Sequence, residues 1–138
     1  MVIQNIEKGG IIHWELVKDT VNAEVFANFL NNIKLPNEEK YYLLLDNIRF
    51  HKSAKVKELL TSKNIEPRYI VASNPYLNPV EEVFNVIKQY VKSEEPRTEE
   101  ELRKVVAYKI SILQKEDLRK HFKNCLDFDF IWKTEINY

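Results

Sequence analysis

Apolar and polar positions recur along the chain with two different periods. In the segment 22–33, five apolar residues fall on one helical stripe, which predicts an amphipathic helix: Val25, Phe26, Phe29, Leu30 and Ile33. Residues 41–45 (Tyr-Tyr-Leu-Leu-Leu) instead form an unbroken apolar run that ends at Asp46. That run favours a strand buried on both faces of a parallel sheet.

The remaining pattern predicts further elements on either side of this strand. The start of the chain predicts a hairpin, with strands at 2–6 and 11–17 joined by a turn that holds both glycines. Helices are predicted at 53–63, from 78–81 to about 91, from Thr98 onward, and over 116–126, with a short strand at 68–71 and a hinge at 93–97. No element is predicted for 127–138. Strands that alternate with helices indicate an α/β domain.

Composition narrows the class of protein without naming a function. The 138 residues suit a single domain, and 21 Lys plus Arg balance 21 Asp plus Glu, so no bulk positive charge indicates a nucleic-acid partner. No apolar stretch approaches the roughly 20 residues that span a bilayer, and residues 1–5 lack the basic start and apolar run of a secretion signal. The only cysteine, Cys125, fits a reducing compartment. We therefore expect a cytoplasmic protein, nucleoid-associated if prokaryotic.

Two acidic residues lie at positions where α/β folds can carry functional groups. Asp46 follows the most apolar strand, and functional groups gather at the carboxyl ends of such strands, although an aspartate there also suits a simple turn. Glu81 lies at the start of a predicted helix, where it can equally be the third residue of a capping box with Asn78. Two carboxylates bind a hard cation such as Mg²⁺ only if the fold brings them together. Local sequence leaves both interpretations open, and Glu82 is interpreted as a solvated first-turn acid.

Two longer motifs change that balance. The segment 43–53 (Leu-Leu-Leu-Asp-Asn-Ile-Arg-Phe-His-Lys-Ser) resembles the second-aspartate motif of mariner-like and bacterial insertion-sequence DDE transposases. The segment 74–88 resembles their third motif, in which Leu-Asn-Pro-Ile-Glu precedes an aromatic residue and a lysine. Thirty-four residues lie between Asp46 and Glu81, a separation typical of that family, which selects Glu81 over Glu82. The resemblance covers about residues 1–92, and 93–138 add C-terminal helices to a single domain, 1–138.

The resemblance implies a ribonuclease-H-like mixed sheet flanked by helices and a two-metal mechanism of DNA strand cleavage and strand transfer. It implies Mg²⁺ or Mn²⁺ as cofactor and transposon-end DNA as partner. Asp46 and Glu81 would be the second and third catalytic, metal-binding carboxylates. Five other motif residues are candidate loop or DNA contacts: Asn47, His51, Lys52, Asn78 and Lys88. His51 is expected to organise the loop or face a phosphate rather than bind metal, while His13 and His121 match no motif.

The chain also departs from the family pattern. The family's first aspartate ends an opening strand before the hairpin, and we expect this chain to lack that strand; the nearby acids Glu7, Glu15 and Asp19 do not replace it. Helix-turn-helix modules are not expected either, and the segment before Leu77 lacks the family's usual prolines and acid. A truncated form, weak or inactive alone, is therefore expected. One alternative is a non-catalytic interaction module or remnant that pairs with itself or with a full-length transposase. Another is an unrelated α/β binding domain.

Loss of a central strand leads to a first prediction. The opening strand of a ribonuclease-H-like sheet is central, so its absence would leave unpaired strand edges, which proteins usually cover, pair or exchange. We expect the chain to dimerise or to exchange its N-terminal hairpin. Light scattering at concentrations on the order of tens of micromolar should report a dimer, and a monomer would contradict the expectation.

Overall fold

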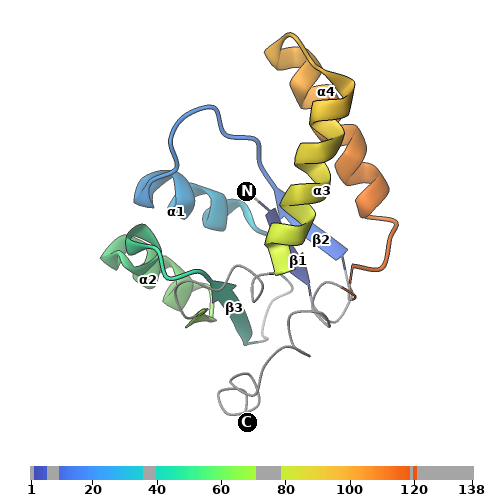
Figure 1. Ribbon diagram of the computed structural model, residues 1–138. Coiled ribbons are helices and arrows are strands. Elements are labelled where there is room, and N and C mark those ends of the chain that lie inside the picture. The colour runs from blue at the N-terminus through green and yellow to red at the C-terminus, as the bar shows by residue number, and fades with distance from the viewer. Residues whose placement is uncertain (1, 6–9, 36–39, 71–78, 119, 121–138) are drawn as a thin grey trace. The chain divides into compact units, whose positions relative to one another are not determined.

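The computed structural model describes residues 2–5, 10–35, 40–70, 79–118 and 120 (Figure 1). The described elements run in the order β1 (Val2–Asn5), β2 (Gly10–Trp14), α1 (Ala23–Asn32), β3 (Tyr41–Leu45), a 3₁₀ turn η1 (Arg49–Lys52), α2 (Ala54–Ser62), β4 (Ile65–Tyr69), α3 (Pro79–Glu94) and α4 (Glu99–Leu113). The chain divides into two compact units: residues 15–74, and residues 2–14 together with the segment from 75 onward. Within the described residues, no helix is long and apolar enough to cross a membrane.

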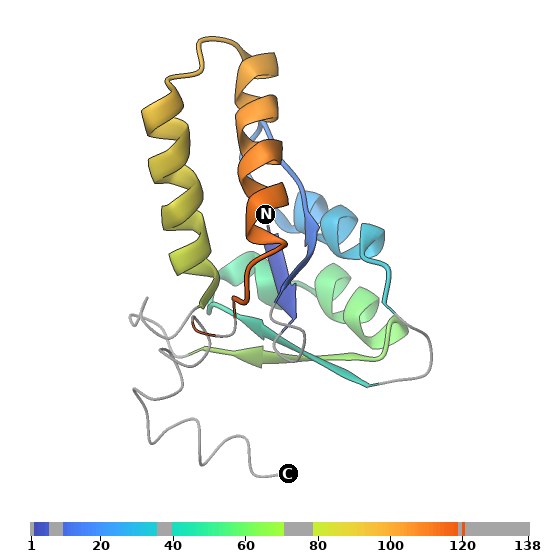
Figure 2. The ribbon, with the colours of Figure 1, turned by 90° about the vertical axis from the view of Figure 1, so that its right-hand side faces the viewer.

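The first unit is built on a parallel pair of strands. β3 and β4 run in register from Tyr41 opposite Ile65 to Leu45 opposite Tyr69. Helices α1 and α2 pack against each other on one side of this pair, as Figure 2 shows. Their apolar faces form the unit's core with the strands, and its buried members include Phe29, Leu30, Leu45, Val56, Leu60 and Ile65.

Caps define the two helices of this unit. The side chain of Asn22 accepts a hydrogen bond from the backbone N–H of Val25 at 2.9 Å, and Ser53 Oγ does the same for Val56 at 3.4 Å. Asn64 adopts a left-handed φ of 56° just past α2, a conformation asparagine tolerates better than most residues. Lys63 Nζ donates to the backbone carbonyl of Asn31 at 3.1 Å, which ties the ends of α1 and α2 together.

The second unit joins the N-terminal hairpin to a pair of long helices. β1 and β2 pair antiparallel with an irregularity between Ile3 and Gln4. Helix α3 contacts β1, α4 contacts β2, and the two helices lie side by side (Figures 1 and 2). Their buried cluster consists of Ile11, Val83, Ile87, Val106, Ile110, Leu113 and Leu118. Thr98 caps α4 by accepting from Glu101 N at 3.1 Å, and Glu101 accepts from Arg97 N at 2.7 Å.

The structure contains the predicted helices at 22–33 and 53–63, the helices that open at 78–81 and at Thr98, and the strand at 41–45. Two predicted strands have different limits. β2 ends at Trp14 rather than Val17, because β1 is four residues long and its first residue, Val2, already pairs with Trp14. The predicted end of the first strand, Ile6, and residues 7–9 of the predicted turn lie outside the described residues, and Gly10 of that turn begins β2. β4 begins at Ile65 rather than Arg68: Pro67 argues against a strand from sequence, yet pairing with β3 includes it.

One burial prediction is wrong. β3 is not buried on both faces: Tyr42 is 40% exposed, and Lys40 Nζ and the Arg68 guanidinium lie 5.2 and 5.3 Å from its ring centroid. Cations over an aromatic ring keep that sheet face polar, and Glu66 pairs with both of them. Residues 116–118 of the predicted helix 116–126 are not helical, whereas Lys120 is. Most of the remainder, with His121 and Cys125, lies outside the described residues, so that helix stays a prediction.

The packing of α1 against α2 gives a stability prediction. The Leu60 side chain is fully buried in the first unit. Leu60→Ala removes that burial and leaves a cavity, so the free energy of unfolding should fall by about 2–5 kcal/mol in denaturant titrations. Glu58→Ala, on the exposed face of the same helix, is the matched control and should change it by less than about 0.5 kcal/mol. Equal stability of the two variants would contradict the described core.

Candidate active site

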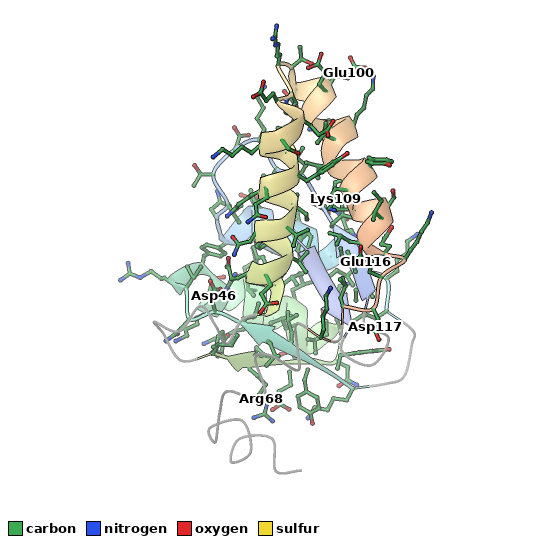
Figure 3. The ribbon with its side chains drawn as sticks, turned by 45° about the vertical axis from the view of Figure 1, so that its right-hand side comes forward. Asp46, Arg68, Glu100, Lys109, Glu116 and Asp117 are labelled. Atoms are coloured by element: carbon green, nitrogen blue, oxygen red, sulfur yellow. The ribbon has the colours of Figure 1, made fainter. Side chains whose placement is uncertain are left out.

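Asp46 lies directly after β3, at the carboxyl end of the parallel pair (Figure 3). The ladder extends to this point, since the backbone N–H of Ile70 donates to the carbonyl of Leu45 at 2.7 Å. Leu45 is buried, whereas the side chain of Asp46 is 43% exposed. The fold therefore presents a carboxylate to solvent from a fixed backbone position, where α/β sheets commonly carry their functional groups.

His51 is the partner of this carboxylate. After Asp46 the chain crosses to η1, whose third residue is His51. His51 Nδ1 lies 2.8 Å from Asp46 Oδ1 and 3.0 Å from the backbone oxygen of Asp46. The imidazole of His51 thus connects η1 back to the end of β3, five positions earlier in the chain.

Aromatic side chains surround that imidazole. The ring of His51 lies 4.4 Å from the ring of Phe26 and 4.5 Å from that of Phe50, measured between centroids. Tyr69, the last residue of β4, donates its hydroxyl to the backbone oxygen of His51 at 3.3 Å. Burial raises the pKa of Tyr69, so its phenol, protonated at neutral pH in any case, remains a hydrogen-bond donor to higher pH.

The two residues that neighbour Asp46 and His51 in the motif are exposed. Asn47 follows Asp46 into solvent. Lys52 is exposed as well, with its ammonium 5.1 Å from the centroid of the Tyr69 ring. A cation held above an aromatic ring at the edge of the loop is partly fixed in place. The loop after β3 therefore carries an acid, an amide and a cation on its accessible side.

Glu81 lies in the first turn of α3, within the second unit. Both Glu81 and its neighbour Glu82 are half-buried, while Val83 is fully buried, so burial does not distinguish the two acids. Lys88 is exposed two turns further along the helix. Asn78 lies outside the described residues, so the capping-box interpretation of Glu81 stays a prediction.

The acids near the N-terminus have ordinary surroundings. Glu15 directly follows β2, because that strand is shorter than the predicted 11–17, and its Oε1 accepts a hydrogen bond from Asn32 Nδ2 at 2.9 Å. Asp19 is exposed in a bend rather than at a strand end. Glu7 lies outside the described residues. Neither described acid is placed like Asp46, at the end of a parallel strand.

Carboxylates suit a hard cation, which takes oxygen ligands and tolerates one or two protein acids with water. Asp46 fits that donor set because its carboxylate is half exposed and held by a neighbour. Glu81 supplies the same chemistry from a helix whose N-terminal dipole favours negative charge. Among the described residues, no three or more His, Cys, Asp or Glu side chains gather as a ready-made metal cluster.

Comparison with known proteins identifies the family. The family model described as DDE superfamily endonuclease matches residues 1–103. The chain belongs to the DDE superfamily of endonucleases. The match spans both motif acids, so the resemblance expected from the two motifs is confirmed at the level of the family. No curated protein matches the chain significantly.

Solved structures show that this DDE endonuclease chain has the ribonuclease-H-like fold of transposase catalytic domains. One is the Mos1 mariner transposase catalytic domain, with TM-score 0.71 and 22% identity over 91% of this chain and 67% of that one. Another holds the same catalytic domain with Raltegravir and Mg, with TM-score 0.69, 22% identity and coverage of 91% and 68%. A third is the Mos1 paired-end complex with the left transposon end, with TM-score 0.70 and 21% identity over 96% of this chain but 40% of that chain.

The predicted α/β class is thus confirmed, and the structure adds contacts that the motifs do not indicate. The spacing of Asp46 and His51 in sequence shows only that both belong to one motif, not that they touch. Tyr69 comes from β4 and matches no motif position, so its hydrogen bond to His51 was not predicted. The separation of five positions between Asp46 and His51 in the sequence is compatible with that contact but does not predict it.

The Tyr69 hydroxyl gives the second stability prediction. Tyr69→Phe removes the hydrogen bond to the His51 backbone while keeping the ring, so unfolding free energy should fall by about 0.5–1.5 kcal/mol. Urea unfolding measures the difference. Tyr108→Phe, at an exposed tyrosine, serves as the control and should unfold like the parent chain. A Tyr69→Phe variant as stable as this control would show that the hydroxyl does not fasten the loop.

Proposed function

We propose that the chain is part of a transposase catalytic domain, in which residues 1–138 act as one domain in DNA strand cleavage and strand transfer. Membership in the DDE endonucleases, through a match that includes Asp46 and Glu81, is the observation that carries the proposal. The half-exposed Asp46 at the carboxyl end of the parallel pair supports it. Structures of a similar transposase with Mg and with Mn support a divalent cation as the cofactor.

In this proposal Asp46 and Glu81 are the second and third acids of the family's set and bind Mg²⁺ or Mn²⁺. A pair of such ions, when bound, stabilises the attacking and leaving oxygens of an in-line phosphodiester displacement. Asp46 contributes a carboxylate that His51 holds, and Glu81 contributes one from the start of α3. Their negative charges offset the charge of the cations before the anionic DNA enters.

Exposed polar groups beside the acids would meet DNA. Asn47 and Lys52 follow Asp46 in the loop after β3, and Lys88 is exposed on α3. A lysine neutralises phosphate charge without reading sequence, so Lys52 and Lys88 would orient the DNA backbone rather than select a target. Asn78 belongs to the same proposed set. A similar transposase has been seen in complex with a transposon end, which supports DNA as the partner of this chain. We also propose that the chain forms a homodimer or a strand-swapped oligomer.

Calorimetric titration with Mn²⁺ tests the metal-binding role. The parent chain should bind Mn²⁺, and Asp46→Ala and Glu81→Ala should each abolish the binding heat, because each removes a charged oxygen ligand. Glu82→Ala is the matched control for Glu81, since both acids lie half-buried in the same helical turn, and it should bind like the parent.

Two other results would contradict this assignment. An equal loss of Mn²⁺ binding in Glu81→Ala and Glu82→Ala would show that the start of α3 attracts cations without using a specific ligand. Absence of binding by the parent chain would favour a non-catalytic interaction module that pairs with itself or with a full-length transposase.

A further inference from the structure

The imidazole of His51 faces two oxygens of the same residue. Its Nδ1 lies 2.8 Å from Oδ1 of Asp46 and 3.0 Å from the backbone carbonyl oxygen of Asp46. A carbonyl oxygen only accepts hydrogen bonds, so the nitrogen facing it must carry the proton. Nδ1–H therefore donates to both oxygens, and this holds for the neutral Nδ1–H tautomer and for the imidazolium alike.

The ring that makes this contact has little freedom. His51 is 8% exposed, and the rings of Phe26 and Phe50 pack on it with centroid distances of 4.4 and 4.5 Å. Its backbone oxygen accepts the Tyr69 hydroxyl at 3.3 Å. A donor fixed by packing and by a backbone tether holds its acceptor more narrowly than a solvent-exposed one. Such burial also argues against His51 as a surface contact to DNA phosphate.

We propose that His51 is a positioning residue: it fixes the side-chain rotamer of Asp46 by pinning Oδ1 to the backbone of the same residue. The inference rests on the proposed function only where it concerns metal, because the orientation itself exists in the metal-free chain. Oδ2 is left outside this hydrogen bond and is the oxygen offered to a cation. Partners that orient a metal-binding carboxylate typically change metal affinity about 10–100-fold when they are removed.

Two substitutions separate the donor from the ring. His51→Phe keeps an aromatic ring between Phe26 and Phe50 but has no donor. His51→Asn loses the ring but places an amide N–H at about the position of Nδ1, because both nitrogens are two bonds from Cβ. If His51 acts through its hydrogen bond, the asparagine variant should retain the orientation of Asp46 and the phenylalanine variant should not. A purely packing role predicts the reverse order.

The direct measurement is the Asp46 χ1 rotamer in the metal-free chain, from NMR three-bond couplings between Hα and the two Hβ protons. The parent chain and His51→Asn should show one large and one small coupling, or two small ones, as a single rotamer requires. His51→Phe should show averaged couplings while the chemical shifts of α4 stay unchanged. A single Asp46 rotamer in His51→Phe, or averaging in the parent chain, would overturn the proposal.

A second measurement needs no variant. Long-range ¹H–¹⁵N correlation spectra of the parent chain should show His51 protonated at Nδ1, and a neutral ring with its proton on Nε2 would overturn the proposal. Mn²⁺ titration then adds the functional consequence: His51→Phe should bind at least about tenfold more weakly than His51→Asn. A parent chain with an ordered Asp46 that binds no Mn²⁺ would contradict the proposed function while supporting the role of His51 in positioning.

Discussion

The parallel pairing of β3 with β4 is the constraint on which the candidate site depends. Five paired positions end at Leu45 and Tyr69, and one more hydrogen bond, from Ile70 to Leu45, holds the strand end from which Asp46 projects. Strand pairing thus supplies both parts of the arrangement, the acid from β3 and the hydroxyl that tethers His51 from β4. A shift of register by one residue would turn Tyr69 to the other face and remove that tether.

Aromatic packing around His51 fixes the side chain that contacts Asp46. Phe26 comes from α1 and Phe50 from η1, so two separate elements confine one imidazole. The buried face of α1 that helps to stabilise the first unit therefore also packs on His51, the neighbour of the proposed metal ligand. Stability and the proposed function are coupled here through contact, because loosening α1 would remove the packing of Phe26 on His51.

How far the sequence predicts the molecule depends on the range of the interaction concerned. Helices such as 22–33 were predicted because the capping residue and the apolar period that define them lie close together in the sequence. The start of β4 was not, since pairing with β3 outweighs the low strand propensity around Pro67. Exposure of Tyr42 was missed because the cations that accompany it, Lys40 and Arg68, come partly from another strand. The motifs predicted Asp46 and Glu81 as candidates but could not show how His51 holds the first of them.

Paramagnetic broadening by substoichiometric Mn²⁺ tests the central claim most directly, because it locates the ion on the chain. In ¹H–¹⁵N spectra of the parent chain, signals around Asp46 and signals around Glu81 should broaden together and at the same Mn²⁺ concentration. The acidic start of α4, at Glu99, Glu100 and Glu101, provides an internal comparison for unspecific attraction. Broadening at α4 alone, or at only one of the two motif acids, would contradict the assignment of Asp46 and Glu81 to the metal site of a DDE endonuclease.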